Sequence, residues 1–297
     1  MRNAQKPVGY HLVLRSHYPL KPFTNREFCV HSWALLRRHF PSSFAVMLMP
    51  NHFHLLVDGT TGDRNTTVDK NWARGRLVLV SRALSKAAGK SLWQPVTEPE
   101  PIPDWFHLKR QIRYVHLNPC RKKLCFDPME WEWSTHRDYL GATANPWPNT
   151  SKILKKLEFG ETKQAAHLFH SYVSGDPSVR IEGTPPPTAP AQPYIGDLVG
   201  AADASLSALR ISHSILAEKG RGRALLMRTL AYQLGVPKYR VAELFGISPN
   251  SIERPLAERI QEDLNLARSL ALLMNDSRLR KREPFSGTLL KQGSKAF

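Results

Sequence analysis

Two histidines stand two residues apart in the segment His52–Val57, which reads His-Phe-His-Leu-Leu-Val. Alternation along a β-strand would place the imidazoles of His52 and His54 on the same face of a sheet. Two imidazoles held in this way can share one metal ion. A pair of solvent-facing or cross-strand polar residues would leave the same pattern, and for an isolated His-x-His we would favour that interpretation. The apolar runs Met47–Met49 and Leu55–Val57 instead indicate a strand inside a sheet, which holds both side chains rigidly.

A tyrosine and an asparagine four residues apart, Tyr114 and Asn118, form a second candidate set. On a helix they would lie on one face. A single helical tyrosine is usually an interfacial aromatic, and Asn118 could simply cap the helix before Pro119. The segment 109–123 favours chemistry, because its six cations and lack of carboxylates suit contact with a phosphodiester. These cations are Lys109, Arg110, Arg113, Arg121, Lys122 and Lys123.

The whole chain is strongly basic. Lys and Arg total 42 against 25 Asp and Glu, a net charge of +17 over 297 residues. This excess favours a polyanionic partner, with nucleic acid first and an acidic membrane surface second. The uncharged stretch Phe40–Val57 is interrupted by prolines and polar residues, so no membrane span is predicted. The scattered cysteines give no disulfide framework, which favours a reducing cytoplasm.

The elements that must position these residues can be read from periodicity and breakers. Strands are predicted over Tyr10–Arg15, Ser43–Met49 and His52–Val57, and helices over Asn25–Phe40, Val68–Ala88 and Asp104–Leu117. The last helix is expected to end at Asn118-Pro119, because the residue before a proline is biased away from helical geometry. The order suits a small antiparallel sheet with helices on one face, an α+β fold.

Four blocks of the sequence resemble, in family order, the single-tyrosine transposases with an HUH motif, specifically the REP-associated tyrosine transposases. Met49–Val57 resembles the HUH motif, and Tyr114–Pro119 resembles the nucleophile helix. Leu92–Gln94 resembles a Leu-Trp-Gln block between the two. Trp133–Ser134 and Tyr139–Gly141 resemble the ending of the domain. Together the blocks span roughly half of the chain.

The resemblance implies a ferredoxin-like antiparallel sheet that forms an HUH nuclease domain. It implies that His52 and His54 bind one divalent metal ion, Mg²⁺ or Mn²⁺, with Asn118 as the third ligand; this neutral set does not exclude Zn²⁺. Tyr114 would attack the scissile phosphate of single-stranded, hairpin-bearing DNA, leaving a 5′-phosphotyrosine and a free 3′-hydroxyl. Because the phosphoryl bond energy is retained, the reverse attack could rejoin strands without ATP.

Two features depart from the family pattern. The segment 95–104 (Pro-Val-Thr-Glu-Pro-Glu-Pro-Ile-Pro-Asp) is proline-rich and acidic where an aromatic, basic run is expected. This questions the local DNA contact but not the catalytic set. His116 is an additional histidine off the Tyr114 face of its helix, and we expect a structural or DNA-contacting role for it.

We divide the chain into four parts. Residues 1–150 form the catalytic domain, and 151–200 form a helical stretch, broken at Gly160, followed by a proline-rich linker. Residues 201–275, with apolar residues at helical spacing, form an all-α DNA-binding domain. Residues 276–297 form a basic, flexible tail.

Within the third part, Val241–Ile252 resembles a helix-turn-helix. Gly246 stands where the tight turn needs a positive φ, and Ser248 with Pro249 suits the start of the second helix. Pro255 would kink that helix, so the bases of a duplex would be read near its start. The candidate readers are Asn250, Ser251 and Arg254. An ordinary helical hairpin would show a similar pattern.

Three functions are compared. The first is a metal-dependent transposase that nicks and rejoins DNA and carries a duplex-binding domain. The second is a domesticated, catalytically silent DNA-binding protein or transcriptional regulator on the same fold. The third, a zinc hydrolase built on His-x-His, would lack a nearby carboxylate base and leave Tyr114 unused. The first is preferred, as a monomer or homodimer that binds DNA in the cytoplasm at the nucleoid.

Overall fold

The computed structural model describes residues 6–60, 68–162, 164–175, 198–212, 214, 221–252 and 262–275. The chain divides into two compact units, Met1–Leu140 with Pro146–Pro185 and Gly141–Asn145 with Pro186–Phe297. The predicted proline-rich linker and basic tail lie outside the described residues. Within the described ranges, no helix combines the length and the apolarity needed to cross a membrane.

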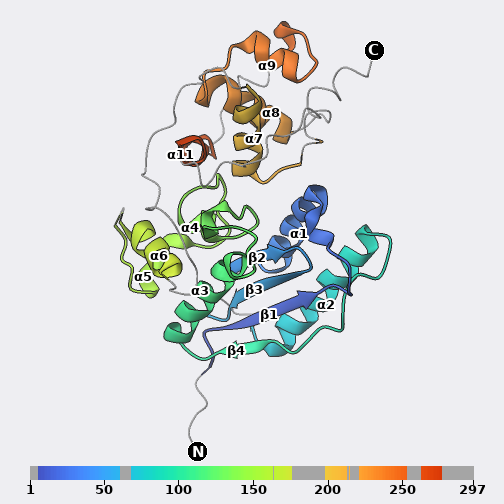
Figure 1. Cartoon of the computed structure of the whole chain (residues 1–297), viewed down its shortest axis with the longest axis vertical. Helices are drawn as coiled ribbons and strands as arrows, with labels where there is room; N and C mark the ends of the chain where they lie inside the picture. Colours follow the sequence, from blue (N-terminus) through green and yellow to red (C-terminus); the bar gives the residue numbers. More distant parts are fainter. Residues whose placement is uncertain are drawn as a thin grey trace, which may run out of the picture. The chain divides into compact units, whose positions relative to one another are not determined.

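The first unit is built on a four-stranded antiparallel sheet with strand order β2-β3-β1-β4 (Figure 1). The strands are β1 (Gly9–Arg15), β2 (Ser43–Met49), β3 (His52–Asp58) and β4 (Glu100–Ile102). Two helices, α1 (Arg26–His39) and α2 (Lys70–Ala87), complete the βαββαβ order of a ferredoxin-like unit. The predicted α+β class with an antiparallel sheet is therefore confirmed.

Strand β4 is an element that the sequence did not predict. It pairs with β1 and places Glu100 opposite His11. The prolines of the segment 95–104 argue against a strand, because proline lacks a backbone donor and is rare in strands. An edge position tolerates Pro101, since only one side of β4 is paired.

Different helices cover the two faces of the sheet. On one face, Leu12, Leu14 and Phe53 belong to a core shared with α1 and α2. On the other, Met47 and Leu56 belong to a core shared with α3 (Trp105–Arg121). The prediction that helices lie on one face is therefore right for α1 and α2 and wrong for α3. The physical reason is that β2 is buried at every position, so both faces need cover.

Helix α3 continues one turn further than predicted. Pro119 lies inside the helix, and the N–H of Lys122 donates to the carbonyl of Asn118 at 3.0 Å. The proline costs a helical hydrogen bond, but the buried side chains of Leu117 and Cys120 pack in this turn and offset that loss. Asn118 is therefore a helical residue and not a cap.

Two of the sequence blocks that resemble the transposase family form hydrogen bonds to strands of the sheet. Leu92–Gln94 runs beside the end of β1, where the N–H of Gln94 donates to the carbonyl of Arg15 at 2.9 Å. The hydroxyl of Tyr139 donates to the carbonyl of Phe44 in β2 at 2.7 Å. These blocks position strands and take no part in the candidate site.

The described part of the first unit also contains three shorter α-helices, α4 (His136–Tyr139), α5 (Thr150–Lys156) and α6 (Ala165–Ser174), and two 3₁₀ helices, η1 (Pro22–Thr24) and η2 (Pro128–Glu130). Gly160, between α5 and α6, has a φ of +88°. The predicted helical break at this glycine is therefore confirmed.

The described part of the second unit is helical. Its elements are α7 (Leu198–Leu209), α8 (Arg221–Arg228), a π-helical turn (Thr229–Gln233), α9 (Lys238–Leu244), η5 (Pro249–Ile252) and α11 (Glu262–Asn275). The predicted helix-turn-helix segment comprises α9, a turn at Gly246 and η5. Gly246 has the expected positive φ, +60°, and Ile252 is buried. The continuation of the second helix falls outside the described residues.

Candidate active site

The two histidines of β3 face each other on the side of the sheet that α3 covers. His52 and His54 are 6% and 4% exposed. Their Nε2 atoms are 3.2 Å apart, and their rings are inclined at 79°. The strand thus holds two imidazole nitrogens within reach of a single bound ion.

Helix α3 brings an asparagine and a tyrosine to the same place. Asn118 is buried, and its amide nitrogen lies 2.8 Å from His54 Nε2. Tyr114 is 41% exposed, and its ring centroid is 5.8 Å from that of His54. One helical turn separates the two residues, so both point to the histidines. Asn118 completes a buried polar set, and Tyr114 stands at its open side.

These residues fit a divalent metal ion. Two nitrogens that each lie about 2.1 Å from one ion are about 3–3.5 Å apart, a range that includes the observed 3.2 Å. A half-turn of the Asn118 amide would exchange its nitrogen for its oxygen, a ligand suited to Mg²⁺ or Mn²⁺. Among the described residues, no group of three or more His, Cys, Asp and Glu side chains is placed to hold a metal. The Asn118 amide, 2.8 Å from His54 Nε2, is a polar group that could serve as a third ligand.

Both histidines of the set are neutral at neutral pH. Burial lowers the pKa of His54 to about 2, and the neighbouring His11 and His52 add to this effect. Burial, assisted by nearby cations, lowers the pKa of His52 to about 4. His52 Nδ1 lies 2.7 Å from Asn51 Oδ1, which can accept its proton. That contact leaves the Nε2 lone pair of His52 free for a metal ion.

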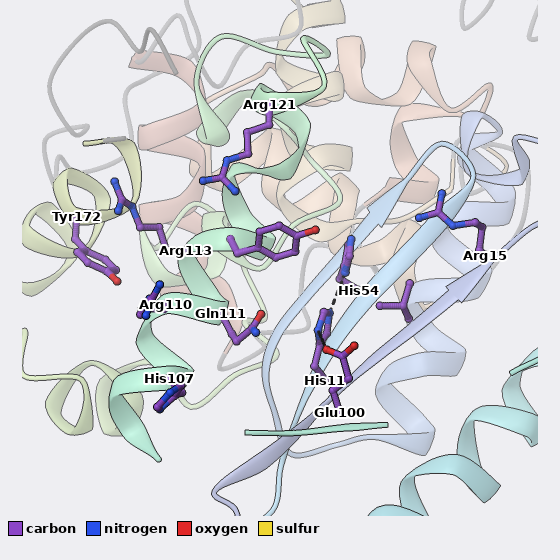
Figure 2. A pocket seen from close by; sticks show the side chains of 12 residues that line it. His11, Arg15, His54, Glu100, His107, Arg110, Gln111, Arg113, Arg121 and Tyr172 are labelled. Atoms are coloured by element: carbon purple, nitrogen blue, oxygen red, sulfur yellow. Dashed lines mark hydrogen bonds and ion pairs between the residues drawn. The ribbon is translucent and has the colours of Figure 1, made fainter. Parts of the chain in front are cut away.

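A pocket of about 730 Å³ opens beside this set (Figure 2). The guanidinium carbon of Arg121 lies 5.6 Å from the ring centroid of Tyr114. That of Arg113 lies 5.3 Å from the ring centroid of Tyr172 on α6. A pocket that combines guanidinium groups with aromatic rings suits a phosphodiester and an adjoining base. Its arginines are Arg15, Arg110, Arg113 and Arg121.

The six cations of the segment 109–123 divide into two groups. Half of them line the pocket with Tyr114, namely Arg110, Arg113 and Arg121. Lys109 instead places its Nζ 4.3 Å from the ring centroid of Phe159. Lys122 and Lys123 are exposed but do not line the pocket. The arginines of this segment therefore line the pocket, and its lysines do not.

The candidate base readers lie in the second unit. Asn250 and Ser251 are exposed on η5. Ser251 Oγ is 2.9 Å from Ser248 Oγ. Arg254 lies outside the described residues.

The pocket-lining residues that were not predicted from the sequence include His11, Arg15, Glu100 and Tyr172. Strand β1 contains a usable signal, because every second residue from His11 to Arg15 lines the pocket. No sequence pattern indicated Glu100, since the prolines around it argue against the strand β4. None indicated Tyr172 either, since no local pattern states where α6 packs.

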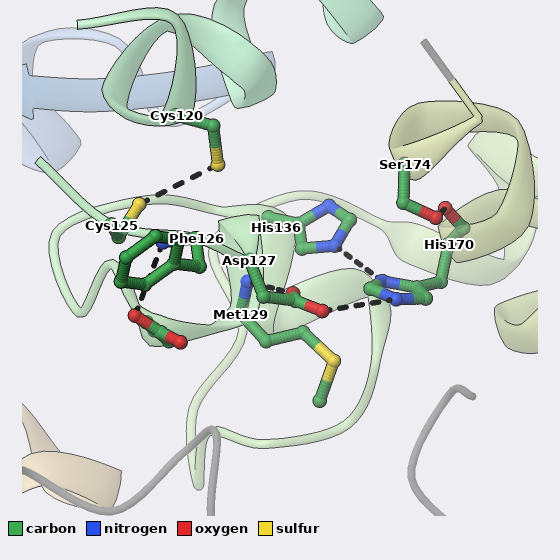
Figure 3. A network of polar contacts seen from close by, with 9 residues as sticks. Cys120, Cys125, Phe126, Asp127, Met129, His136, His170 and Ser174 are labelled. Atoms are coloured by element: carbon green, nitrogen blue, oxygen red, sulfur yellow. Dashed lines mark hydrogen bonds and ion pairs between the residues drawn. The ribbon is translucent and has the colours of Figure 1, made fainter. Parts of the chain in front are cut away.

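A second group of histidines consists of His116 on α3, His136 on α4 and His170 on α6, and Figure 3 shows His136 beside His170. His136 Nε2 is 3.0 Å from His170 Nδ1. His116 Nε2 is 3.1 Å from the hydroxyl of Thr135. The three imidazoles are at most 1% exposed. Complete burial favours a structural role for His116 over contact with DNA.

No protein-family model and no curated protein matches the chain. Among solved structures, a REP-associated tyrosine transposase bound to a REP hairpin is similar to it, with 20% sequence identity and a TM-score of 0.37. The match covers 46% of this chain and 82% of that chain. At this level of similarity, the function has to be argued from the site itself.

Proposed function

We propose that the first unit nicks and rejoins single-stranded DNA through a covalent phosphotyrosine. The observation that carries this proposal is the convergence of His52, His54 and Asn118 beside Tyr114, at the wall of a cationic pocket. Two imidazoles and an amide can hold a metal ion, guanidinium groups can orient a phosphodiester, and a partly exposed phenol can attack it. Histidines, tyrosine and arginines are thus all used by one reaction.

In the forward step, Tyr114 Oη forms a bond to phosphorus as the bond from phosphorus to the 3′-oxygen breaks. The phenol loses its proton to solvent and the 3′-oxygen takes one up, so the products are a 5′-phosphotyrosine and a free 3′-hydroxyl. Attack by a 3′-hydroxyl on the phosphotyrosine reverses the step without ATP. Arg121 supplies positive charge where the phenol becomes negative.

His52, His54 and Asn118 would hold the divalent ion, with Mg²⁺ or Mn²⁺ favoured by the amide ligand. Bound there, the ion would supply Lewis-acid stabilisation of the phosphate. Strand β3 fixes the two imidazoles, and α3 fixes Asn118 at one helical turn from Tyr114. The proposed ligand and the proposed nucleophile therefore keep a fixed distance and orientation. This lowers the entropic cost of reaching the transition state.

We propose a hairpin-bearing single strand as the DNA substrate. Arg110, Arg113 and Arg121 would contact its phosphates, and Tyr172 offers a ring on which an unpaired base can stack. The second unit would bind duplex DNA through its helix-turn-helix segment. Its proposed base contacts are Asn250, Ser251 and Arg254.

A covalent-adduct experiment tests the reaction. The full chain is incubated with Mn²⁺ and end-labelled oligonucleotides that form hairpins, drawn from palindromic repeats of the source genome, and the products are separated under denaturing conditions. We expect a protein–DNA adduct with the wild type and its loss in Tyr114→Phe. Tyr172→Phe is the matched control, because it removes a hydroxyl from the same pocket and should leave the adduct intact.

The other outcomes are also informative. An adduct that persists in Tyr114→Phe would contradict the assignment of the nucleophile. DNA hydrolysis that gives no adduct, and that Tyr114→Phe also carries out, would favour the zinc hydrolase. Hairpin binding without any adduct would favour the catalytically silent DNA-binding protein.

A further inference from the structure

His11 connects the candidate metal site to Glu100 across strands β3, β1 and β4 (Figure 2). Its ring lies edge to edge with that of His54, with centroids 5.2 Å apart and planes inclined at 22°. His11 Nε2 lies 3.0 Å from His54 Nδ1. On the other side of the ring, His11 Nδ1 lies 3.6 Å from Glu100 Oε2. The three side chains form a row that leads from an exposed carboxylate to a buried imidazole.

The burial of His11 makes the position of its proton important. The side chain is 7% exposed, and its Nδ1 atom is buried without a hydrogen-bond partner. Leaving such a buried atom without a partner is unfavourable. The Glu100 side chain is 76% exposed and needs to approach by only about 0.7 Å to accept a proton from Nδ1. A lone pair at Nδ1 would instead face the carboxylate, which is unfavourable.

The proton on His11 in turn determines the proton on His54. A neutral imidazole carries one N–H, so a His11 protonated at Nδ1 presents a lone pair at Nε2. His54 Nδ1, 3.0 Å away, must then be the donor. This leaves a lone pair on His54 Nε2, the atom that faces His52 and Asn118. The opposite arrangement would place a proton on His54 Nε2, where a metal ion would have to bind.

We propose that His11 and Glu100 are positioning residues that hold His54 in the Nδ1–H tautomer, the form that can ligate a metal ion through Nε2. This inference rests on the proposed function of the same site. Outer hydrogen bonds of this kind commonly orient histidine ligands. Asn51 does the same for His52 through its 2.7 Å contact. The acidic segment that departs from the family pattern thereby gains a role, since it contains Glu100.

The tautomer can be measured without any metal. Long-range ¹H–¹⁵N spectra of the full chain distinguish Nδ1–H from Nε2–H imidazoles, and the His54 signals are assigned by their loss in His54→Gln. We expect the Nδ1–H form of His54 in the wild type. We expect the Nε2–H form to gain population in Glu100→Leu, which removes the acceptor, and in His11→Phe. A wild-type His54 in the Nε2–H form, or a tautomer unchanged in both variants, would overturn the inference.

Metal binding supplies the second readout. Free Mn²⁺ is titrated into the full chain and followed by its paramagnetic resonance signal. We expect Mn²⁺ to bind about 10–100-fold more weakly to His11→Phe, as for other outer-shell changes, and a few-fold more weakly to Glu100→Leu. His11→Gln should recover part of the loss, because its side-chain oxygen can accept the proton of His54 Nδ1. A merely structural role would not be rescued in this way.

Two controls separate this inference from the proposed function. His107→Gln should bind Mn²⁺ like the wild type, since His107 lines the same pocket but hydrogen-bonds to Asp104. His52→Ala should abolish binding. If His52→Ala binds Mn²⁺ normally, the proposed metal site fails. If it abolishes binding while His11→Phe leaves both affinity and tautomer unchanged, only the role of His11 fails.

Discussion

Histidines gather at two places in the first unit, and both groups are buried rows of imidazoles in mutual contact. The first group is His11, His52 and His54 on the sheet. The second group, called here the helix group, is His116, His136 and His170, on α3, α4 and α6 respectively. Burial lowers the pKa of His54 to about 2 and the pKa of His116 to about 3. A lowered pKa therefore does not tell a functional histidine from a structural one in this protein.

Each row has a carboxylate 3.6 Å from one end, the exposed Glu100 for the sheet group and the buried Asp127 for the helix group, and the groups also differ in what their other nitrogens meet. The helix group ends on the hydroxyl of Thr135 at 3.1 Å, and on its other side His170 Nε2 lies 3.6 Å from Asp127 Oδ2. The sheet group leaves His52 Nε2 and His54 Nε2 facing each other beside a pocket. The proposed catalytic role rests on these converging nitrogens beside Tyr114 and the arginines of the pocket. A row that ends on internal partners favours a structural role.

Replacing a histidine of the sheet group should give the largest effect, on activity. His54→Ala removes a proposed metal ligand, and several kcal/mol of transition-state stabilisation correspond to a loss of about 10³-fold in the rate of adduct formation. The rate is measured with the hairpin oligonucleotide and Mn²⁺. A rate within tenfold of the wild type would show that the sheet group is not catalytic.

Replacing a histidine of the helix group should affect stability instead. His136→Ala removes a fully buried ring and its contact with His170, and we expect a loss of about 3 kcal/mol in the free energy of unfolding. Urea titration measures this loss, with the exposed His107→Ala as the control. Adduct formation per folded molecule should stay within about twofold of the wild type. A loss of more than about twofold in adduct formation per folded molecule would contradict the purely structural role of the helix group.

The pH dependence of stability sharpens the same contrast. Burial, with help from His116 and His170, holds the pKa of His136 well below its ordinary value. The unfolded chain binds this proton near pH 6.5 and the folded protein does not, so the free energy of unfolding is highest above pH 6.5 and falls below it. The slope is about 1.4 kcal/mol per pH unit for each such group. In His136→Phe, urea titrations between pH 6 and 5 should show that the free energy of unfolding changes less steeply with pH, by about that amount. An unchanged slope would contradict the conclusion that His136 is neutral in the folded protein.

The smallest effect concerns the cations beside the sheet group. Arg121→Gln should weaken hairpin binding a few-fold and reduce the slope of log affinity against log salt by about one. Fluorescence anisotropy across a salt series measures both quantities. Arg82→Gln is the matched control, because Arg82 lies on α2, which covers the opposite face of the sheet. Equal losses in both variants would mean that binding depends on net charge and not on the pocket.

Local patterns predicted much of the fold. The alternation in β3 and the helical spacing of α1 and α2 appear within a few residues of the expected bounds. The shared face of Tyr114 and Asn118 followed from their four-residue spacing. The predicted end of α3 was wrong because the rule for the residue before a proline is a local bias, and the packing of Leu117 and Cys120 overrides it.

The sequence by itself determined which residues share a face of one element, because the period of a strand or a helix is a property of consecutive residues. Tertiary structure alone decided which faces meet. It placed His11 against His54, set Glu100 on an edge strand beside His11, and packed α6 so that Tyr172 lines the pocket. Such contacts depend on the packing of whole elements that are distant in the chain, and no short stretch of residues specifies them.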